Sequence, residues 1–381
     1  MDQTSREFQV FIKPVGAICN LRCSYCYYLS RKELYPAEAF PRMKEELLEE
    51  YIRQQFDATT DDTLFFSWHG GEPTLAGLEF YRKAVALQKK MLPQGKRLLN
   101  GIQTNGTRLD EAWCRFLARE NFLVGISMDG PEEFHNLHRR DRHEKGTFND
   151  VLRGWRLLQK FGVTTEILCV VNSFNAVYPL KIYRFFRELG ARHITFLPLV
   201  ERTSDSSEGV TAASVPAEAF GRFLIEIFDE WAQYDIGRVT IQHFEEALRT
   251  AFDQEHTLCI FKETCGGVPV VEHNGDVYSC DHYVNPAHLL GNVREHSLSH
   301  YIDSPRQKAF GAAKKTTLPR NCRECPVLGM CNGECPKNRF INTPDGESGL
   351  NYLCEGYRLF FKHCLPMVET IKALRSSDNH L

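Results

Sequence analysis

The chain has 381 residues, 43% of them hydrophobic and 25% charged, with a formal net charge of −3. This composition is typical of a globular protein with room for two domains, and the charge gives no reason to expect nucleic acid as a partner. Because residues 1–18 lack the basic start and apolar core of a secretory signal and no long apolar run follows, we expect a cytoplasmic protein without a membrane partner.

In chain order, short β-rich runs alternate with amphipathic helical stretches up to about residue 200. The runs lie at 8–13, 63–69, 97–104, 122–128, 166–171 and 193–200, and the clearest helical stretches lie at 43–56, 78–92 and 177–189. This alternation predicts βα units around a parallel sheet. The turns HGGEPT, NGT and DGP follow the second, third and fourth runs, so we expect them to meet at the carboxyl ends of the strands.

A strong helical pattern covers 216–234, and beyond it the alternation fades while cysteines become frequent. We place a domain boundary there. The prediction is an α/β domain over 1–235 and a loop-rich domain over 236–381 that depends on metal more than on a large core.

The 14 cysteines fall into recognisable sets. Three of them, Cys19, Cys23 and Cys26, follow the first predicted strand, and eight more lie between 259 and 354. In a reducing compartment such clusters favour metal ligation over disulfides. Four thiolates suit zinc or an iron–sulfur cluster equally, and spacing alone does not decide between them. Three cysteines leave a coordination position open, as catalytic metal centres do.

The motifs resemble those of a known family. CxxxCxYC over 19–26 is similar to the signature of radical S-adenosylmethionine (SAM) enzymes, and GGEP over 70–73 to their SAM-binding turn. The pattern C-x9-G-x4-C from Cys265, followed by C-x2-C-x5-C-x3-C from Cys322, resembles the SPASM domain. Within that superfamily the chain most resembles the anaerobic sulfatase-maturating enzymes, through segments 70–80, 103–107, 121–131, 135–139 and 278–284.

The resemblance implies an α/β fold, with a partial (β/α)6 TIM-like barrel as the radical SAM core and a C-terminal cysteine-rich SPASM domain. It implies three [4Fe–4S] clusters with SAM bound at one of them. The first cluster would be held by Cys19, Cys23 and Cys26, the first auxiliary cluster by Cys259, Cys265, Cys280 and Cys335, and the second auxiliary cluster by Cys322, Cys325, Cys331 and Cys354.

The resemblance also suggests roles for other residues. Contacts to SAM are expected from Tyr25, Gly71, Ser127 and Arg139, and Val200 or its neighbour Leu199 is a candidate for packing against adenine. A glycine lets backbone approach a ligand, and arginine suits a carboxylate. Asp281, directly after Cys280, is the expected general base.

The implied activity is oxidation of a cysteine or serine in an unfolded sulfatase polypeptide to formylglycine, started by a 5′-deoxyadenosyl radical that takes a hydrogen from Cβ. A reduced donor of the flavodoxin or ferredoxin type would supply electrons. Two alternatives stay open at this point. One is a SPASM enzyme that modifies a small ribosomal peptide, and the other is a zinc-stabilised binding protein without catalysis.

Three cysteines, Cys114, Cys169 and Cys364, match no motif, and we expect them to be small buried side chains. Trp68, just before the GGEP turn, is expected to serve in aromatic packing.

Overall fold

The fold is that of a computed structural model, which describes residues 8–36, 41–203 and 209–378. The chain forms two compact units, each built from separate stretches of sequence. The first comprises Met1–Met128, His135–Glu166 and Gly266–Gly311, and the second comprises Asp129–Phe134, Ile167–Cys265 and Ala312–Leu381. The sequence-based division after residue 235 stays a prediction.

Strands and helices alternate through most of the chain. The strands are β1 (Phe11–Lys13), β2 (Thr63–Trp68), β3 (Arg97–Thr104), β4 (Phe122–Ser127), β5 (Thr164–Val171), β6 (His193–Pro198), β7 (Thr240–Ile241), β8 (Val270–Glu272), β9 (Asp276–Tyr278), β10 (Leu289–Asn292), β11 (Arg339–Asn342) and β12 (Ser348–Asn351). The α-helices are α1 (Glu45–Ala58), α2 (Leu78–Met91), α3 (Glu111–Arg119), α4 (Glu132–His138), α5 (Phe148–Lys160), α6 (Pro179–Glu188), α7 (Ala217–Tyr234), α8 (Gln242–Arg249), α9 (Leu298–Ile302), α10 (Pro305–Thr316), α11 (Arg320–Arg323), α12 (Leu328–Cys331) and α13 (Cys354–Asp378).

In the first unit, β1, β2, β3 and β4 pair in parallel in that order. On the other side of β1 lies β8, also parallel, followed by the antiparallel strands β9 and β10. The six predicted strands up to residue 200 are all present, and those of this unit confirm the parallel α/β arrangement. The addition of β8 places a segment far along the sequence directly beside the first strand.

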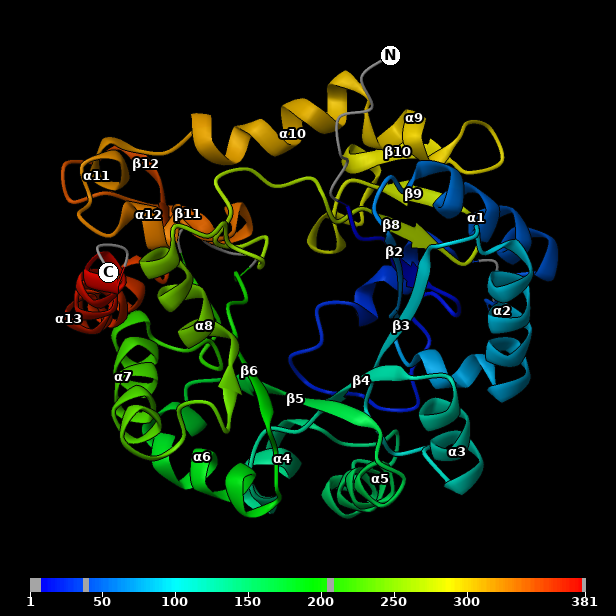
Figure 1. The fold of residues 1–381 in the computed structure, drawn as a ribbon, viewed down its shortest axis with the longest axis horizontal. Helices are drawn as coiled ribbons and strands as arrows, with labels where there is room; N and C mark the ends of the chain where they lie inside the picture. The colour runs from blue at the N-terminus through cyan, green and yellow to red at the C-terminus, as the bar shows by residue number, and fades with distance from the viewer. Residues whose placement is uncertain (1–7, 37–40, 204–208, 379–381) are drawn as a thin grey trace. The chain divides into compact units, whose positions relative to one another are not determined.

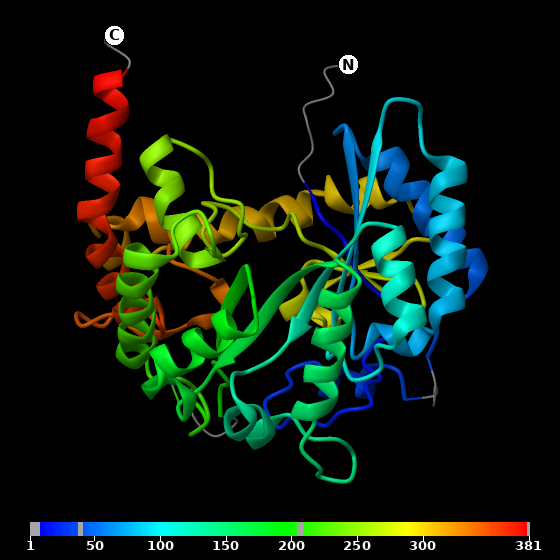
Figure 2. The same ribbon diagram turned by 60° about the horizontal axis from the view of Figure 1, so that its bottom comes forward.

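Helices α1 and α2 of the first unit lie side by side next to β2 and β3 (Figure 1), and they remain adjacent in the turned view of Figure 2. In α1 the buried side chains Leu47, Leu48, Tyr51 and Ile52 recur at one- and three-residue steps, which makes one apolar face. The sequence prediction of helices at 43–56 and 78–92 is therefore confirmed to within two residues at their ends.

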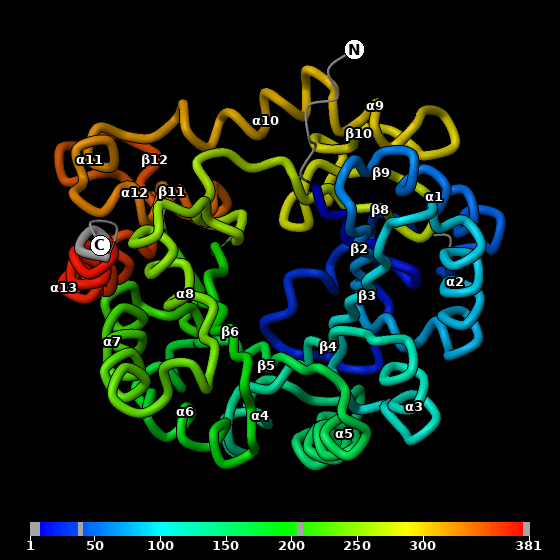
Figure 3. The backbone as a smooth tube through the Cα atoms, in the orientation of Figure 1, coloured from blue at the N-terminus to red at the C-terminus, as the bar shows by residue number. Residues whose placement is uncertain are grey.

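In the second unit, β5, β6 and β7 pair in parallel, and β11 and β12 form a separate antiparallel hairpin. Helices α7 and α13 pack against each other, as the tube in Figure 3 shows. Gly221 and Gly356 permit this approach, because a Cβ on Gly221 would lie 2.5 Å from the Gly356 carbonyl oxygen. Across the described ranges, every helix is too short or too polar to cross a bilayer.

Candidate active site

The three N-terminal cysteines lie in the loop between β1 and a short 3-10 helix, η1 (Leu29–Leu34). Cys19 is buried, and Cys23 and Cys26 are partly exposed. The Cys19 sulfur accepts hydrogen bonds from the Leu21 amide at 3.3 Å and from Asn105 Nδ2 at 3.7 Å. Donors aimed at sulfur stabilise a thiolate ligand, so the loop fits an iron–sulfur cluster.

The GGEP turn after β2 runs against the backbone of the cysteine loop. The amide of Gly71 donates to the Gly16 carbonyl at 2.8 Å, and the amide of Glu72 donates to the Ile18 carbonyl at 2.8 Å. A Cβ added to Gly71 would lie 2.2 Å from the Ile18 oxygen. Glycine is therefore required here for close packing of two backbones, one residue before Cys19.

Glu72 ties the GGEP turn to the NGT turn after β3. Its fully buried carboxylate accepts from the Thr74 amide at 3.0 Å, the Thr104 hydroxyl at 2.7 Å and the Asn105 amide at 2.7 Å. Burial raises the pKa of Glu72, although the hydrogen bonds from these donors act to lower it. Asn105 in turn donates to Asn20 Oδ1 at 3.0 Å. Two turns that are distant in sequence, GGEP and NGT, thus converge on the cysteine loop, as the sequence analysis expected. The convergence of the DGP turn stays a prediction.

Tyr25 and Arg139 are brought together, because the Arg139 guanidinium carbon lies 5.5 Å from the centre of the Tyr25 ring. Both side chains are buried. Ser127, also buried, is the last residue of β4. Val200 is buried in the second unit, two residues after the end of β6. The contacts of these residues and of Gly71 with SAM stay predictions.

Asp281 starts a 3-10 turn, η5 (Asp281–Tyr283), and is buried. Its Oδ1 lies 2.5 Å from Lys13 Nζ, and its Oδ2 accepts a short hydrogen bond from the Tyr27 hydroxyl. Burial disfavours the charge, but Lys13, His282 and the Tyr27 hydrogen bond outweigh it and hold the pKa of Asp281 well below its usual range. The carboxylate is therefore ionised and fixed in orientation beside the cysteine loop.

Sequence reasoning missed Lys13 and Tyr27. Lys13 ends β1, is only 2% exposed, and also lies with its Nζ 4.2 Å from the Tyr28 ring centre. A lysine at the end of an otherwise apolar strand was the available signal, because a buried cation needs an anionic partner. Nothing local to Tyr27 marks it, since its partner is 254 positions away.

His69 faces the same group of residues. Its ring stacks on Phe11 with the ring centres 3.8 Å apart, and its Nε2 lies 2.7 Å from the Ser67 hydroxyl. Burial, followed by the nearby charge of Lys13, lowers the pKa of His69 to about 3. The ring is therefore neutral at pH 7. Trp68 is fully buried and donates to Asn100 Oδ1 at 2.8 Å, which confirms its packing role.

Four of the C-terminal cysteines, all in the second unit, line one cavity together with Tyr357 and Arg358: they are Cys322, Cys325, Cys331 and Cys354. Four cysteines that line one cavity supply the ligand type of an iron–sulfur cluster. Of the other predicted set, Cys259, Cys265 and Cys335 belong to the second unit and Cys280 to the first. The assignment of ligands to clusters stays a prediction. Cys114, Cys169 and Cys364 are fully buried, as expected.

Comparison with known proteins agrees with the family that the motifs resemble. The family model of the Radical SAM superfamily matches residues 14–186, and the model of SPASM, an iron–sulfur cluster-binding domain, matches residues 259–326. A serine-type anaerobic sulfatase-maturating enzyme of Bacteroides thetaiotaomicron is 44% identical, with 97% of this chain and 92% of that protein covered. A cysteine-type enzyme of Clostridium perfringens is 34% identical, with 94% and 96% covered.

Among solved structures, native anSMEcpe with bound AdoMet and the Cp18Cys peptide has a TM-score of 0.86 and 33% identity, covering 96% of this chain and 98% of that one. The fold class expected from the sequence is confirmed by this match. Radical SAM enzymes carry a [4Fe–4S] cluster and use SAM, and SPASM domains bind further iron–sulfur clusters. The chain belongs to the anaerobic sulfatase-maturating enzymes, oxidoreductases of the radical SAM superfamily that carry a SPASM domain.

Proposed function

We propose that this enzyme oxidises a serine or cysteine of an unfolded sulfatase polypeptide to formylglycine, with Asp281 as the general base. The observation that carries the proposal is the fixed, ionised Asp281 carboxylate, which is bonded to the residue next to Cys26. A base must lie within hydrogen-bond reach of the proton it removes. The position of Asp281 beside the cysteine loop would allow that for a peptide side chain bound there.

When bound, SAM would supply the radical that takes the Cβ hydrogen atom of the substrate, and an auxiliary cluster would accept the second electron. The protein supplies the proton acceptor. Lys13 holds Oδ1 of Asp281 and Tyr27 holds Oδ2, so the carboxylate keeps one orientation while it takes the O–H or S–H proton. A buried, pre-oriented acceptor does not have to reorganise during the reaction.

The cofactor contacts are part of the same proposal. Cys19, Cys23 and Cys26 would hold the cluster that binds SAM, and Tyr25, Gly71, Ser127, Arg139 and Val200 would surround SAM. The two auxiliary sets would be Cys259, Cys265, Cys280 and Cys335, and Cys322, Cys325, Cys331 and Cys354. The convergence of the first loop with the GGEP turn and the shared cavity of the last set support these assignments.

Serine is the target residue that the relatives favour. The relative at 44% identity and two Klebsiella relatives at 36% are named serine-type, and the cysteine-type relatives are 32–34% identical. The structures of anSMEcpe with the Cp18Cys and Kp18Cys peptides support a peptide segment as substrate. The electron donor is expected to be of the flavodoxin or ferredoxin type, and the location to be cytoplasmic.

The test is anaerobic. The reconstituted enzyme, holding about twelve irons, is given SAM, reductant and two sulfatase-motif peptides, one with serine and one with cysteine. A mass loss of about 2 Da from the serine peptide or about 18 Da from the cysteine peptide, as the stoichiometry of formylglycine requires, establishes the activity and its target. Clusters and SAM cleavage with neither mass change contradict the proposed substrate.

The role of Asp281 is tested in the same assay with Asp281→Asn. The variant keeps the size of the side chain but loses the proton acceptor, so we expect normal iron content and normal 5′-deoxyadenosine formation without formylglycine. Full formylglycine formation by Asp281→Asn would rule out its role as the base.

A further inference from the structure

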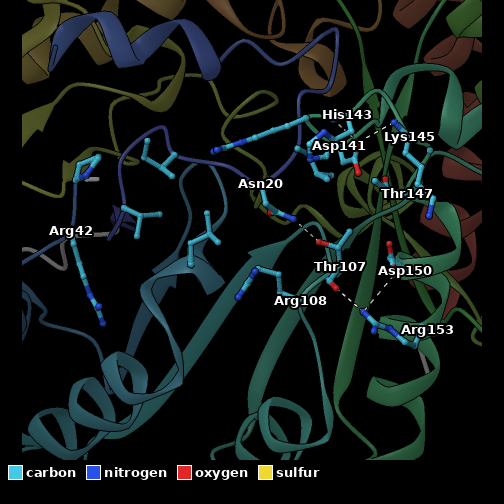
Figure 4. Close-up of a pocket in the computed structure, with 17 residues that line it drawn as sticks. Asn20, Arg42, Thr107, Arg108, Asp141, His143, Lys145, Thr147, Asp150 and Arg153 are labelled. Carbon is cyan, nitrogen blue, oxygen red and sulfur yellow. Dashed lines mark hydrogen bonds and ion pairs between the residues drawn. The ribbon is translucent and has the colours of Figure 1, made fainter. Parts of the chain in front are cut away.

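Two cavities that share Leu21 and Arg142 open in the first unit beside the cysteine loop. The larger has a volume of about 770 Å³ and is drawn in Figure 4; the smaller has a volume of about 480 Å³. The larger is lined from the NGT turn, from the segment between α4 and α5, and from α5 itself. Because the two share lining residues, they are neighbours, and the pair is here named the basic recess.

The lining of the basic recess is strongly cationic. Its lysines and arginines are Arg22, Lys32, Arg42, Arg108, Arg142, Lys145 and Arg153. Only two carboxylates, Asp141 and Asp150, are among the lining residues. The chain as a whole has a net charge of −3, so this concentration of positive charge runs against the general composition. A recess lined by one sign of charge attracts partners of the opposite sign.

The two carboxylates do little to cancel the cations. Asp141 accepts from the backbone amides of His143 at 2.8 Å and Lys145 at 2.9 Å, which serves the local turn. Asp150 lies 3.8 Å from the exposed Arg153 guanidinium, a loose surface pair. Among the residues the structure describes, no hydrogen bond or ion pair occupies the side chains of Arg108 and Lys145.

The basic recess also reaches the first cysteine. Cys19 is one of the residues that line the smaller cavity, and Arg142 Nη2 donates to the Cys19 carbonyl at 2.8 Å. A partner seated on the basic recess would therefore lie next to a residue proposed to hold the SAM-binding cluster. Lys13, Tyr27 and Asp281 are not among its lining residues, so this partner would not occupy the place of the base.

We propose that the basic recess is the docking surface for a small acidic electron-carrier protein that reduces the SAM-binding cluster. This inference rests on the proposed function, because reductive cleavage of SAM consumes one electron per event. Electron-transfer complexes are characteristically small and weak, and opposite charges bring the partners together quickly and in register. A small acidic carrier and the cationic recess would form such a complex, because their charges are opposite.

The test compares two ways of reducing the same enzyme. One reductant is a purified flavodoxin kept reduced by its NADPH-dependent reductase, and the other is dithionite, which needs no docking surface. The variant is Arg108→Glu with Lys145→Glu. The matched control is Lys90→Glu with Lys308→Glu, two exposed lysines of the same unit that line neither cavity and give the same change in net charge. The readout is 5′-deoxyadenosine formation.

With flavodoxin, we expect the recess variant to lose roughly tenfold or more in kcat/KM for the carrier, and the control to match the wild type. With dithionite all three enzymes should be equal. Raising the salt concentration should slow the wild type with flavodoxin more steeply than the recess variant, because salt screens exposed charges. The readout does not depend on the peptide, so failure of formylglycine formation is a separate result.

Equal flavodoxin-supported rates in the recess variant and the wild type would overturn the proposal. Loss of the dithionite rate in the variant would also overturn it, since the residues would then act on the site itself. Binding of a labelled RNA oligonucleotide is measured for the same enzymes. If the recess variant loses RNA binding while its rate with flavodoxin is unchanged, the recess binds nucleic acid and the proposal is wrong.

Discussion

Tyr27 and Tyr28 are adjacent and chemically identical, yet they have different partners. The Tyr27 hydroxyl donates to Asp281, and the Tyr28 hydroxyl donates to Glu272, the last residue of β8. Desolvation around the hydroxyl groups, followed by the nearby carboxylates, raises the pKa of both phenols, although the Tyr27 side chain as a whole is 39% exposed. Both hydroxyls therefore stay protonated and act as donors. Tyr27 therefore contacts the proposed base, whereas Tyr28 contacts a residue of the sheet.

We predict that Tyr27→Phe lowers the rate of formylglycine formation roughly tenfold, because a hydrogen bond to a charged group contributes about 1.5–3 kcal/mol and here fixes the orientation of the base. Formation of 5′-deoxyadenosine should be unchanged. Tyr28→Phe is the matched control. It leaves Asp281 with both partners and is expected to keep the wild-type rate. Equal effects of the two substitutions on formylglycine formation would show that the Tyr27 hydrogen bond has no special role.

At the scale of elements, the cysteine loop is shaped by the two turns that pack on it. The GGEP turn contributes two backbone hydrogen bonds, to Gly16 and Ile18, and the NGT turn contributes the contacts of Asn105. The loop itself has little regular structure before η1. Its shape is therefore determined by neighbours from β2 and β3, and any substitution that separates the turn from the loop should disturb the cluster site.

Gly71→Ala tests this dependence. Its Cβ would lie 2.2 Å from a backbone oxygen of Ile18, which has no flexible side chain to yield. We expect reconstituted iron to fall by roughly four atoms per chain, the content of one [4Fe–4S] cluster, together with loss of SAM binding by equilibrium dialysis.

The control is Gly329→Ala, where an added Cβ meets nothing within 4 Å. It should retain all iron. Full iron content and SAM affinity in Gly71→Ala would contradict the packing argument.

At the scale of the whole molecule, both units bury apolar side chains, and part of the second unit adds cations that bind backbone oxygens. The sheet strands and helices of the first unit bury apolar faces. In part of the second unit, a buried lysine and a half-buried arginine also donate to backbone oxygens. Lys314, fully buried, donates to the carbonyls of Cys259 and Ile260 at 2.7 Å, and Arg339 donates to that of Gly333 at 2.9 Å. We expect this cysteine-rich region to depend on its metal clusters for folding.

We predict that Cys322→Ala with Cys325→Ala lowers the iron content by roughly four atoms per chain and makes the second unit the first site of limited proteolysis. Cleavage of SAM should persist, because the first cysteine loop is unaltered. Cys364→Ala, at a buried cysteine of the same unit that matches no ligand motif, should keep all iron. An unchanged iron content in the double variant would remove Cys322 and Cys325 from the ligand set.

The sequence by itself predicted the first six strands and four of the helices, and the resemblance of its motifs to a known family indicated the chemistry. The periodicity of 43–56 and 216–234 predicted α1 and α7, the alternating runs predicted the strands, and the cysteine spacing with GGEP indicated the radical SAM family. These features are local, since helix and strand periods and ligand spacings lie within a few residues of one another. The burial of Cys114, Cys169 and Cys364 followed from the same local patterns.

Only the tertiary structure decided what surrounds Asp281. Parallel pairing of β8 with β1 sets Lys13 opposite Glu272, and the turn that follows β9 then brings Asp281 to Lys13 and Tyr27. No periodicity announces a pairing between residues 259 positions apart in the chain. The basic recess arises in the same way, from turns and a helix that are separate in sequence. The pairing of distant strands and the gathering of basic side chains in one recess both depend on the folded backbone. Local sequence patterns therefore do not predict them.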